Sequence, residues 1–269
     1  MPFTLSHAAA SLPFRRFNPV WPALVMGTFA PDMQYFILLS DEDRSGHHFP
    51  NVLLFTLPLA LLVLWAFERV VKGPVIELLP SQLQRRMQDK IEPLSFRGWR
   101  RRASIVFWIV VGIFTHLMWD EFTHPLSRVA AIWPILQSRV ELPYIGARPV
   151  AAILQHLSTL VGMLVLLIWF VAWYRRASPV GETSTAEFPA STKVSLVSGM
   201  VVLGFALGCS LGLLVLSDHP PPITRTFVAA TLLEAVTLVL CVEMLLYGTA
   251  MTVSRRHRVA VTELHRPSR

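Results

Sequence analysis

Five stretches of about twenty apolar residues constrain the fold of this chain more than any other feature. They cover residues 51–71, 103–121, 149–173, 195–216 and 226–250. About 20 helical residues cross the hydrocarbon core of a bilayer, which is about 30 Å thick. Lipid offers no hydrogen-bond partner to an exposed backbone, so such stretches cross as helices. The sequence therefore predicts an all-α, polytopic helical membrane protein with about five transmembrane helices.

The low content of charged residues supports this prediction. Only 15% of the 269 residues are charged and 53% are hydrophobic, whereas about a quarter of the residues of a soluble domain are charged. The net charge of +7 lies in a few clusters between the apolar stretches, which indicates a membrane surface and argues against nucleic acid. Membrane lipid is the expected partner, and the sequence leaves the oligomeric state open.

The apolar region 19–39 is interrupted by Pro31 and Asp32. A broken segment with a carboxylate at the break is tolerated at membrane depth where it lines a polar cavity. We therefore expect a broken, half-buried or re-entrant helix pair at the N-terminus. In the alternative, residues 19–39 span the membrane fully, and His7 then lies on the far side from Asp32.

Positive charge in the connecting segments predicts the domain organisation and the orientation. Lys and Arg number eight in residues 72–102 and three in 174–194, but two in 122–147. Because cytoplasmic loops carry the excess of Lys and Arg, the first two segments are expected in the cytoplasm. Residues 1–173 are predicted to form a membrane domain with the candidate site, and residues 174–194 a cytoplasmic linker. Residues 195–250 are predicted to form two further transmembrane helices, and residues 251–269 a basic cytoplasmic tail.

The end of the second apolar stretch carries His116, Asp120 and His124, spaced by four residues. Residues four apart share one face of a helix, and Pro125 ends the helix. Imidazoles and a carboxylate on one face are typical ligands of Zn²⁺ and related ions. The two histidines are roughly 12 Å apart along the helix axis, so we expect Asp120 to offer one oxygen to each of two ions about 4 Å apart.

The orientation brings further candidate metal ligands to the same face of the membrane. His47 and His48 precede the first span, and His156 lies near the start of the third. If residues 19–39 are re-entrant, His7 and Asp32 join them on the outer face. The competing interpretation has no metal, with the histidines acting as polar anchors at the membrane interface.

Several motifs resemble those of an uncharacterised family of bacterial membrane proteins, DUF4184. The resemblance covers roughly residues 1–165 and rests on Met1-Pro2-Phe3-Thr4-Leu5-Ser6-His7, Phe29-Ala30-Pro31-Asp32, His47-His48-Phe49-Pro50, Thr115-His116-x-x-Trp119-Asp120-x-x-Thr123-His124-Pro125 and Leu154-Gln155-His156-x-Ser158-Thr159. More distantly, the chain is similar to YdjM/YbcI-type membrane proteins, which are named as metal-dependent hydrolases. These in turn resemble the zinc-dependent phospholipase C and S1/P1 nuclease group, which has an all-helical fold and a trinuclear zinc site.

The distant resemblance implies roles for the candidate ligands. Asp120 would be the bridging carboxylate, with His116, Asp32 and either His47 or His48 at the first ion; spacing to Pro50 favours His47. His124 and His156 would serve the second ion, and His7 would match an N-terminal ligand. The soluble enzymes have a Glu four residues after their last histidine, where this chain has Leu160. This departure favours two zinc ions over three.

The expected function is that of a membrane-bound metal-dependent hydrolase in the bacterial inner membrane, with its site on the outer face. The location suggests a lipid or lipid-linked phosphoester as substrate. Asp32 and Asp120 are the candidate catalytic residues, because either carboxylate could act as general base. The alternative is a metal-binding membrane protein without catalysis, such as a sensor or a transporter.

Overall fold

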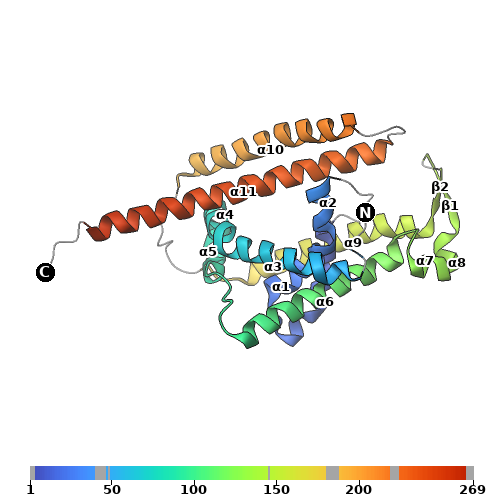
Figure 1. Ribbon diagram of the computed structural model, residues 1–269, viewed down its shortest axis with the longest axis horizontal. Helices are drawn as coiled ribbons and strands as arrows, with labels where there is room; N and C mark the ends of the chain where they lie inside the picture. The colour runs from blue at the N-terminus through green and yellow to red at the C-terminus, as the bar shows by residue number, and fades with distance from the viewer. Residues whose placement is uncertain are drawn as a thin grey trace. The chain divides into compact units, whose positions relative to one another are not determined.

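The computed structural model describes residues 4–39, 47, 49–144, 146–179, 188–218 and 224–264. In this part of the chain, five helices are long and apolar enough to cross a membrane, which confirms the prediction of an all-α polytopic protein (Figure 1). The five spans are Val52–Leu78, Trp99–Ile132, Val150–Arg176, Ala190–Asp218 and Phe227–Arg255. Each overlaps one of the five apolar stretches of the sequence.

The helices follow one another along the chain with few other elements between them. The first span is built of η4 (Val52–Thr56), α3 (Leu57–Ala66), η5 (Phe67–Val71) and α4 (Lys72–Leu78), and the short elements α5 (Ser81–Arg86) and η6 (Gln88–Lys90) follow. The remaining long helices are α6 (Trp99–Thr123), α9 (Val150–Arg176), α10 (Ala190–Asp218) and α11 (Arg225–Leu264).

The connection between α6 and α9 contains more structure than the loop expected at residues 122–147. It consists of α7 (Arg128–Ile132), α8 (Pro134–Gln137) and an antiparallel hairpin of β1 (Arg139–Leu142) and β2 (Gly146–Pro149). The hairpin pairs Arg139 with Pro149 and Leu142 with Gly146. A hairpin of four-residue strands has no apolar run, so the hairpin was not predicted from the sequence.

The N-terminal region is broken at the expected position. It comprises the 3-10 helix η1 (Thr4–Phe17), α1 (Trp21–Phe29), the 3-10 turn η2 (Ala30–Asp32) and α2 (Met33–Leu38). The helices η1 and α1 pack against each other, and the Thr4 hydroxyl donates a hydrogen bond of 2.8 Å to Asp32 Oδ2. The chain therefore turns back on itself and returns Asp32 to the level of Thr4.

Two glycines allow α1 and α6 to touch along their backbones. A Cβ atom on Gly27 would lie 2.2 Å from the carbonyl oxygen of Ile109, and one on Gly112 would lie 2.3 Å from that of Leu24. Close backbone approach at small residues is a general way in which membrane helices associate. The side chains around this crossing are buried, with Leu24 and Ile109 both 0% exposed.

One stripe of α6 faces the interior and continues into the candidate site. Its buried residues recur at helical spacing and are Ile105, Ile109, Gly112, Ile113, His116, Asp120 and Thr123. The first four fill the contact with α1, whereas His116 and Asp120 extend the same stripe beyond it. The helix packing that buries the apolar residues therefore also fixes the direction of these two polar side chains.

The chain divides into two compact units, and the candidate ligands belong to the first. The first unit comprises the described residues of Met1–Gln34, Arg44–Leu64 and Phe96–Arg176, and the second those of Tyr35–Asp43, Trp65–Ser95 and Ala177–Arg269. In the second unit, α10 and α11 lie side by side (Figure 1). The glycines of α10 at this contact are Gly204, Gly208 and Gly212, which face Leu240, Val236 and Leu232 of α11.

Two buried glutamates of the second unit are paired with basic side chains. Glu68, which is 3% exposed, forms an ion pair with Lys72 and accepts a hydrogen bond of 2.8 Å from the backbone N–H of Leu94. Glu77 forms an ion pair with Arg255. Removing one partner of such a pair would leave an uncompensated buried charge, which is strongly destabilising, so we assign these groups a structural role.

The outward side chains of the long helices are apolar. Leu160, Leu164 and Ile168 on α9 are 56% to 70% exposed. A soluble protein rarely exposes an apolar surface of this extent, whereas in a bilayer the acyl chains of the lipid cover it. The structure therefore identifies an integral membrane protein.

We predict that Gly112→Ala destabilises the protein by about 1–3 kcal/mol, the usual cost of overpacking. The added methyl group would push α1 away from α6 at the Leu24 carbonyl. Thermal unfolding of the detergent-solubilised protein measures this effect. Gly199→Ala is the matched control, because Gly199 lies in α10 with no atom within 4 Å of the added Cβ, so helix propensity should leave its stability unchanged or increased. Equal unfolding temperatures for both variants would contradict the proposed backbone contact.

Candidate metal centre

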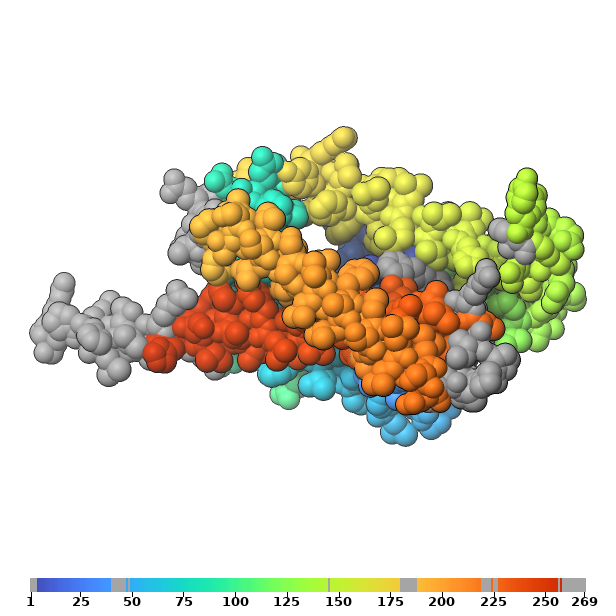
Figure 2. Space-filling view, turned by 90° about the horizontal axis from the view of Figure 1, so that it is seen from above, coloured from blue at the N-terminus to red at the C-terminus, as the bar shows by residue number. Residues whose placement is uncertain are grey.

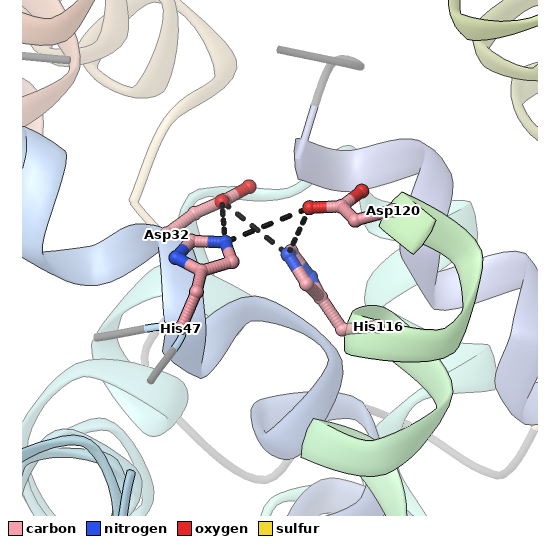
Figure 3. Close-up of side chains that lie close together, drawn as sticks. All are labelled: Asp32, His47, His116 and Asp120. Atoms are coloured by element: carbon pink, nitrogen blue, oxygen red, sulfur yellow. Dashed lines mark ion pairs between the residues drawn. The ribbon is translucent and has the colours of Figure 1, made fainter. Parts of the chain in front are cut away.

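Four side chains from three separate parts of the chain converge in the first unit (Figure 3). Asp32 comes from η2, His47 precedes the first span, and His116 and Asp120 come from α6. His116 Nε2 lies 3.2 Å from Asp120 Oδ2 and 3.4 Å from Asp32 Oδ1. His47 Nε2 lies 3.5 Å and 3.6 Å from the same two oxygens.

These distances match the ligand shell of a small divalent ion. Zn²⁺ binds nitrogen and oxygen ligands at about 2.0–2.2 Å, so neighbouring ligand atoms of a tetrahedral site are about 3.3–3.6 Å apart. The four observed nitrogen–oxygen distances span 3.2 to 3.6 Å. Two imidazoles with two carboxylates suit Zn²⁺ or a similar transition metal better than Ca²⁺ or Mg²⁺, which prefer oxygen.

The hydrogen bonds around the four side chains orient them toward a common point. His116 Nδ1 lies 2.8 Å from the backbone oxygen of Thr28, and a backbone oxygen can only accept. Nδ1 therefore carries a proton, and Nε2 is directed at the two carboxylates. Thr4 holds Asp32 through Oδ2, so Oδ1 faces the cluster. Metal-ligating histidines and carboxylates are commonly oriented by such outer contacts.

The buried nitrogen of His116 is evidence that a cation belongs at this point. His116 is 0% exposed, and its Nε2 has no hydrogen-bond partner among the described residues. A buried polar atom without a partner is costly. An ion between Nε2 and the carboxylate oxygens would satisfy all of these atoms, so the residues present fit a divalent metal.

The other oxygen of Asp120 faces a second pair of histidines. His7 Nε2 and His124 Nδ1 each lie 3.6 Å from Asp120 Oδ1. The ring of His7 stacks on that of His116 with centroids 4.0 Å apart. His7 is 1% exposed, and neither of its ring nitrogens has a hydrogen-bond partner among the described residues. Asp120 therefore stands between two groups of histidines, with one oxygen toward each.

The 3-10 geometry of η1 explains why two N-terminal residues reach the centre. Side chains three residues apart eclipse one another in a 3-10 helix, so Thr4 and His7 project from the same face. Between these two residues, Ser6 contacts Gly162 of α9. A Cβ atom on the glycine would lie 2.9 Å from the Cβ atom of Ser6. This close packing holds the start of η1 against α9.

The ionisation of three of these residues follows from their surroundings. Burial, followed by the neighbouring His116, lowers the pKa of His7 to about 4. For Asp32, burial raises the pKa, but the charge of His116 and contacts with His116 and His47 outweigh it and hold the pKa below its usual range. For His47, burial lowers the pKa, but the facing carboxylates of Asp120 and Asp32 outweigh it and raise the pKa above its usual value.

The structure brings together most, but not all, of the candidate ligands predicted from the sequence. Asp32, His47, His116 and Asp120 form the cluster, and His7 and His124 contact its edge at Asp120. His156 is exposed on α9 and is not a member of the four-residue cluster. His48 lies outside the described residues, so His47 is the loop histidine that the structure places in the centre.

Two contributions were missed by sequence reasoning. Thr4 is part of the N-terminal motif and is a candidate helix cap, but the sequence does not predict its contact with Asp32. The carbonyl of Thr28 orients His116 through the backbone and carries no signal in the residue type. Thr4 lies three residues before the candidate ligand His7, and this spacing would have indicated a shared face if the segment had been predicted to be a 3-10 helix.

Comparison with known proteins identifies the family. A family model described as "Domain of unknown function (DUF4184)" matches residues 1–254, so the chain belongs to this family. The match extends beyond the motifs around the candidate centre and includes α10 and most of α11. Searches of curated proteins and of solved structures found no match.

We predict that zinc binding strengthens as the pH rises through the pKa of His47 and releases at least one proton per ion. The carboxylates stabilise protonated His47, and the ion must displace that proton because only neutral imidazole is a ligand. His7, with a pKa of about 4, is already neutral near pH 7 and contributes no proton there. Affinity should therefore fall about tenfold per pH unit, for each displaced proton, below the pKa of His47.

Calorimetric titration of the detergent-purified protein with zinc, in two buffers of different ionisation enthalpy, measures the protons released. His47→Gln removes the titrating ring and should lower the proton release by about one per ion, as expected for one ionisable group. Binding with no proton release in either buffer would contradict this assignment.

Proposed function

We propose that this protein is a membrane-bound metal-dependent hydrolase that holds two divalent ions, of which zinc fits best. One observation carries the proposal: the two oxygens of Asp120 face two different groups of histidines, at 3.2–3.5 Å on one side and 3.6 Å on the other. A carboxylate shared in this way is the arrangement that two-ion hydrolytic sites use.

The first ion would be held by Asp32, His47, His116 and Asp120 Oδ2. The second would be held by His7, Asp120 Oδ1 and His124, whose Nδ1 would exchange its 3.2 Å contact with the backbone oxygen of Asp120 for the ion. Three protein ligands at the second position leave room for water or substrate, as in catalytic zinc sites. Ions held in this way supply a bound water whose pKa is lowered to near neutrality and polarise a phosphoryl oxygen. The distant resemblance to metal-dependent hydrolases supports the same reaction class.

The two aspartates are the proposed catalytic residues, with different roles. Asp120 would offer one oxygen to each ion, and the positive charge of the ions would lower the basicity of both oxygens. Asp32 offers Oδ1 to the cluster, while its Oδ2 accepts a hydrogen bond from Thr4. A carboxylate oxygen has two lone pairs, so Oδ2 retains one with which to accept the proton of the attacking water as general base.

The proposed substrate is a phosphoester of a lipid or of a lipid-linked molecule. Asp120 lies near the C-terminal end of α6, and three arginines, Arg100, Arg101 and Arg102, lie near its N-terminal end. By the positive-inside rule the arginine end faces the cytoplasm. The centre then lies at the outer interface of the bacterial inner membrane, at the depth where lipid phosphates are found.

A second candidate function is that of a metal sensor or transporter without catalysis. The observation that favours it is the closed shell of the first position, where four protein ligands converge as they do in structural zinc sites. A transporter usually binds its substrate near the bilayer midplane, whereas this cluster lies near one end of α6. Sensing is therefore the stronger form of this alternative.

Metal content by mass spectrometry of the detergent-purified protein tests the proposal. We predict about two zinc ions per chain, because the carboxylate-bridged arrangement has two positions. The double variant His116→Ala/Asp120→Ala should lose both ions, since it removes the shared carboxylate and the most buried imidazole. His156→Ala is the matched control, because this exposed histidine is absent from the cluster and its loss should leave the metal content unchanged.

A hydrolysis screen with p-nitrophenyl phosphate, bis-p-nitrophenyl phosphate and vesicle-embedded phosphatidic acid separates the two candidate functions. Hydrolysis that is lost in Asp32→Asn, abolished by a chelator and restored by zinc would support the enzyme. One tightly held ion with no hydrolysis of any of these esters would favour the sensor. Absence of metal from the native protein after zinc reconstitution would contradict both candidate functions.

A further inference from the structure

The segment between α6 and α9 exposes apolar and aromatic side chains outside the long helices. This segment, residues 126–149, is described except for residue 145 and contains α7, α8, β1 and β2. Its large exposed apolar residues are Leu126, Ile132, Trp133, Ile135, Val140 and Tyr144. Tyr144 lies at the tip of the hairpin and Leu126 is 84% exposed. Figure 2 shows the light-green atoms of this segment as a projection at the end of α9.

Positive charge accompanies these apolar groups. Arg128, Arg139 and Arg148 are exposed, whereas Glu141 is the sole acidic residue of the segment in the sequence. Trp and Tyr side chains concentrate at membrane–water interfaces, and arginine guanidinium groups bind phosphate. The combination matches the headgroup layer of a bilayer that contains anionic lipid.

Continuity with the membrane-spanning helices places the segment at the bilayer surface. The helix α6 has 25 residues and, at about 1.5 Å per residue, has crossed the hydrocarbon core by Thr123. The helix α9 begins at Val150 and crosses again. A short connection between two crossing helices remains close to the surface that both helices leave.

The segment is fixed to the end of α6 that carries the candidate metal ligands. Ser127 Oγ donates a hydrogen bond of 2.5 Å to the backbone oxygen of Glu121, and the backbone N–H of Val129 donates one of 3.1 Å to Glu121 Oε2. Gln137 Nε2 donates to the backbone oxygen of Pro125. A small core of Ala130, Leu136 and Ala151 joins α7 and α8 to α9. These contacts therefore fix the position of the segment relative to that of Asp120.

We propose that residues 126–149 form a headgroup platform: their apolar and aromatic side chains rest in the interfacial layer, and their arginines bind the phosphates of anionic lipids. The platform sets the depth of the metal centre relative to the lipid phosphates. Its contact with the membrane stands independently, whereas its role in presenting a lipid substrate rests on the proposed hydrolase function.

Depth measurements on the full-length protein in lipid nanodiscs test the membrane contact. In a Cys209→Ser/Cys241→Ser background, a nitroxide is attached at Ile135→Cys or Tyr144→Cys. References are Asp89→Cys for water and Leu164→Cys for acyl chains, because the first lies in a charged, exposed pair and the second on the apolar surface of α9. Accessibility to oxygen and to a nickel chelate is compared in phosphatidylcholine with and without phosphatidylglycerol.

The platform labels should report a depth between the two references and should move toward Leu164 when phosphatidylglycerol is present. Arg128→Gln/Arg139→Gln/Arg148→Gln should abolish that shift, whereas Arg85→Gln/Arg101→Gln/Arg102→Gln, which removes the same charge elsewhere, should leave it unchanged. If the platform labels are as accessible to the nickel chelate as the label at Asp89 in both lipids, the proposal is overturned. The platform surface would then be available to bind a soluble partner.

Hydrolysis assays distinguish the role of the platform in presenting a lipid substrate from the hydrolase function on which that role rests. The platform triple variant should lower kcat/KM for vesicle-embedded phosphatidic acid, by about fivefold for each arginine that contacts the surface, but not that for p-nitrophenyl phosphate. Equal loss for both esters would overturn the role in substrate presentation. Absence of hydrolysis by the native protein would refute the hydrolase, while the depth measurement would still decide the membrane contact.

Discussion

The first unit depends on how two buried carboxylates are neutralised. Asp32 is 1% exposed and Asp120 is 9% exposed, and their inward oxygens belong to a group of four ligand atoms that all lie within 4.8 Å of one another. Two negative charges within that separation repel by about 3.5 kcal/mol or more at an effective dielectric constant of 20. If His116 is neutral, its one N–H points to the backbone oxygen of Thr28 and its Nε2 offers only a lone pair to these oxygens, so a proton on that nitrogen or a metal ion must supply positive charge.

The packing of the first unit forces these groups together. Because Gly27 and Gly112 let α1 and α6 touch, Asp32 and Thr28 are carried to the same level as His116 and Asp120. The cost of gathering like-charged side chains is thus offset by apolar burial elsewhere along the helix pair, at Leu24, Ile105 and Ile109. A site assembled in this way is held in its binding geometry before any ion arrives, which lowers the ordering cost of binding.

Much of this arrangement was predictable from the sequence, for identifiable physical reasons. The spans follow from length and hydropathy, and the shared face of His116, Asp120 and His124 follows from helical spacing. That the two oxygens of Asp120 face different histidines was also expected, because histidines eight residues apart on one helix are too far apart to bind the same ion. The structure places His116 and His124 on opposite oxygens of Asp120. The 3-10 form of η1 could not be predicted, since runs of more than three or four residues are uncommon, and neither could the role of the Thr28 carbonyl.

The asymmetry of the two positions at Asp120 bears on what the centre can do. Four protein atoms surround the first position, and a filled shell of this kind binds an ion firmly but leaves no place for a reactant. The second position has His7, His124 and one oxygen, and His7 is contributed by a separate N-terminal segment, which packs on α9 through Ser6 and Gly162. Chemistry would therefore belong to the second position, with the first ion anchoring Asp120. In that case η1 would be the element that distinguishes a reactive centre from a structural one, because without His7 the second position would retain only residues of α6 and the turn that follows it.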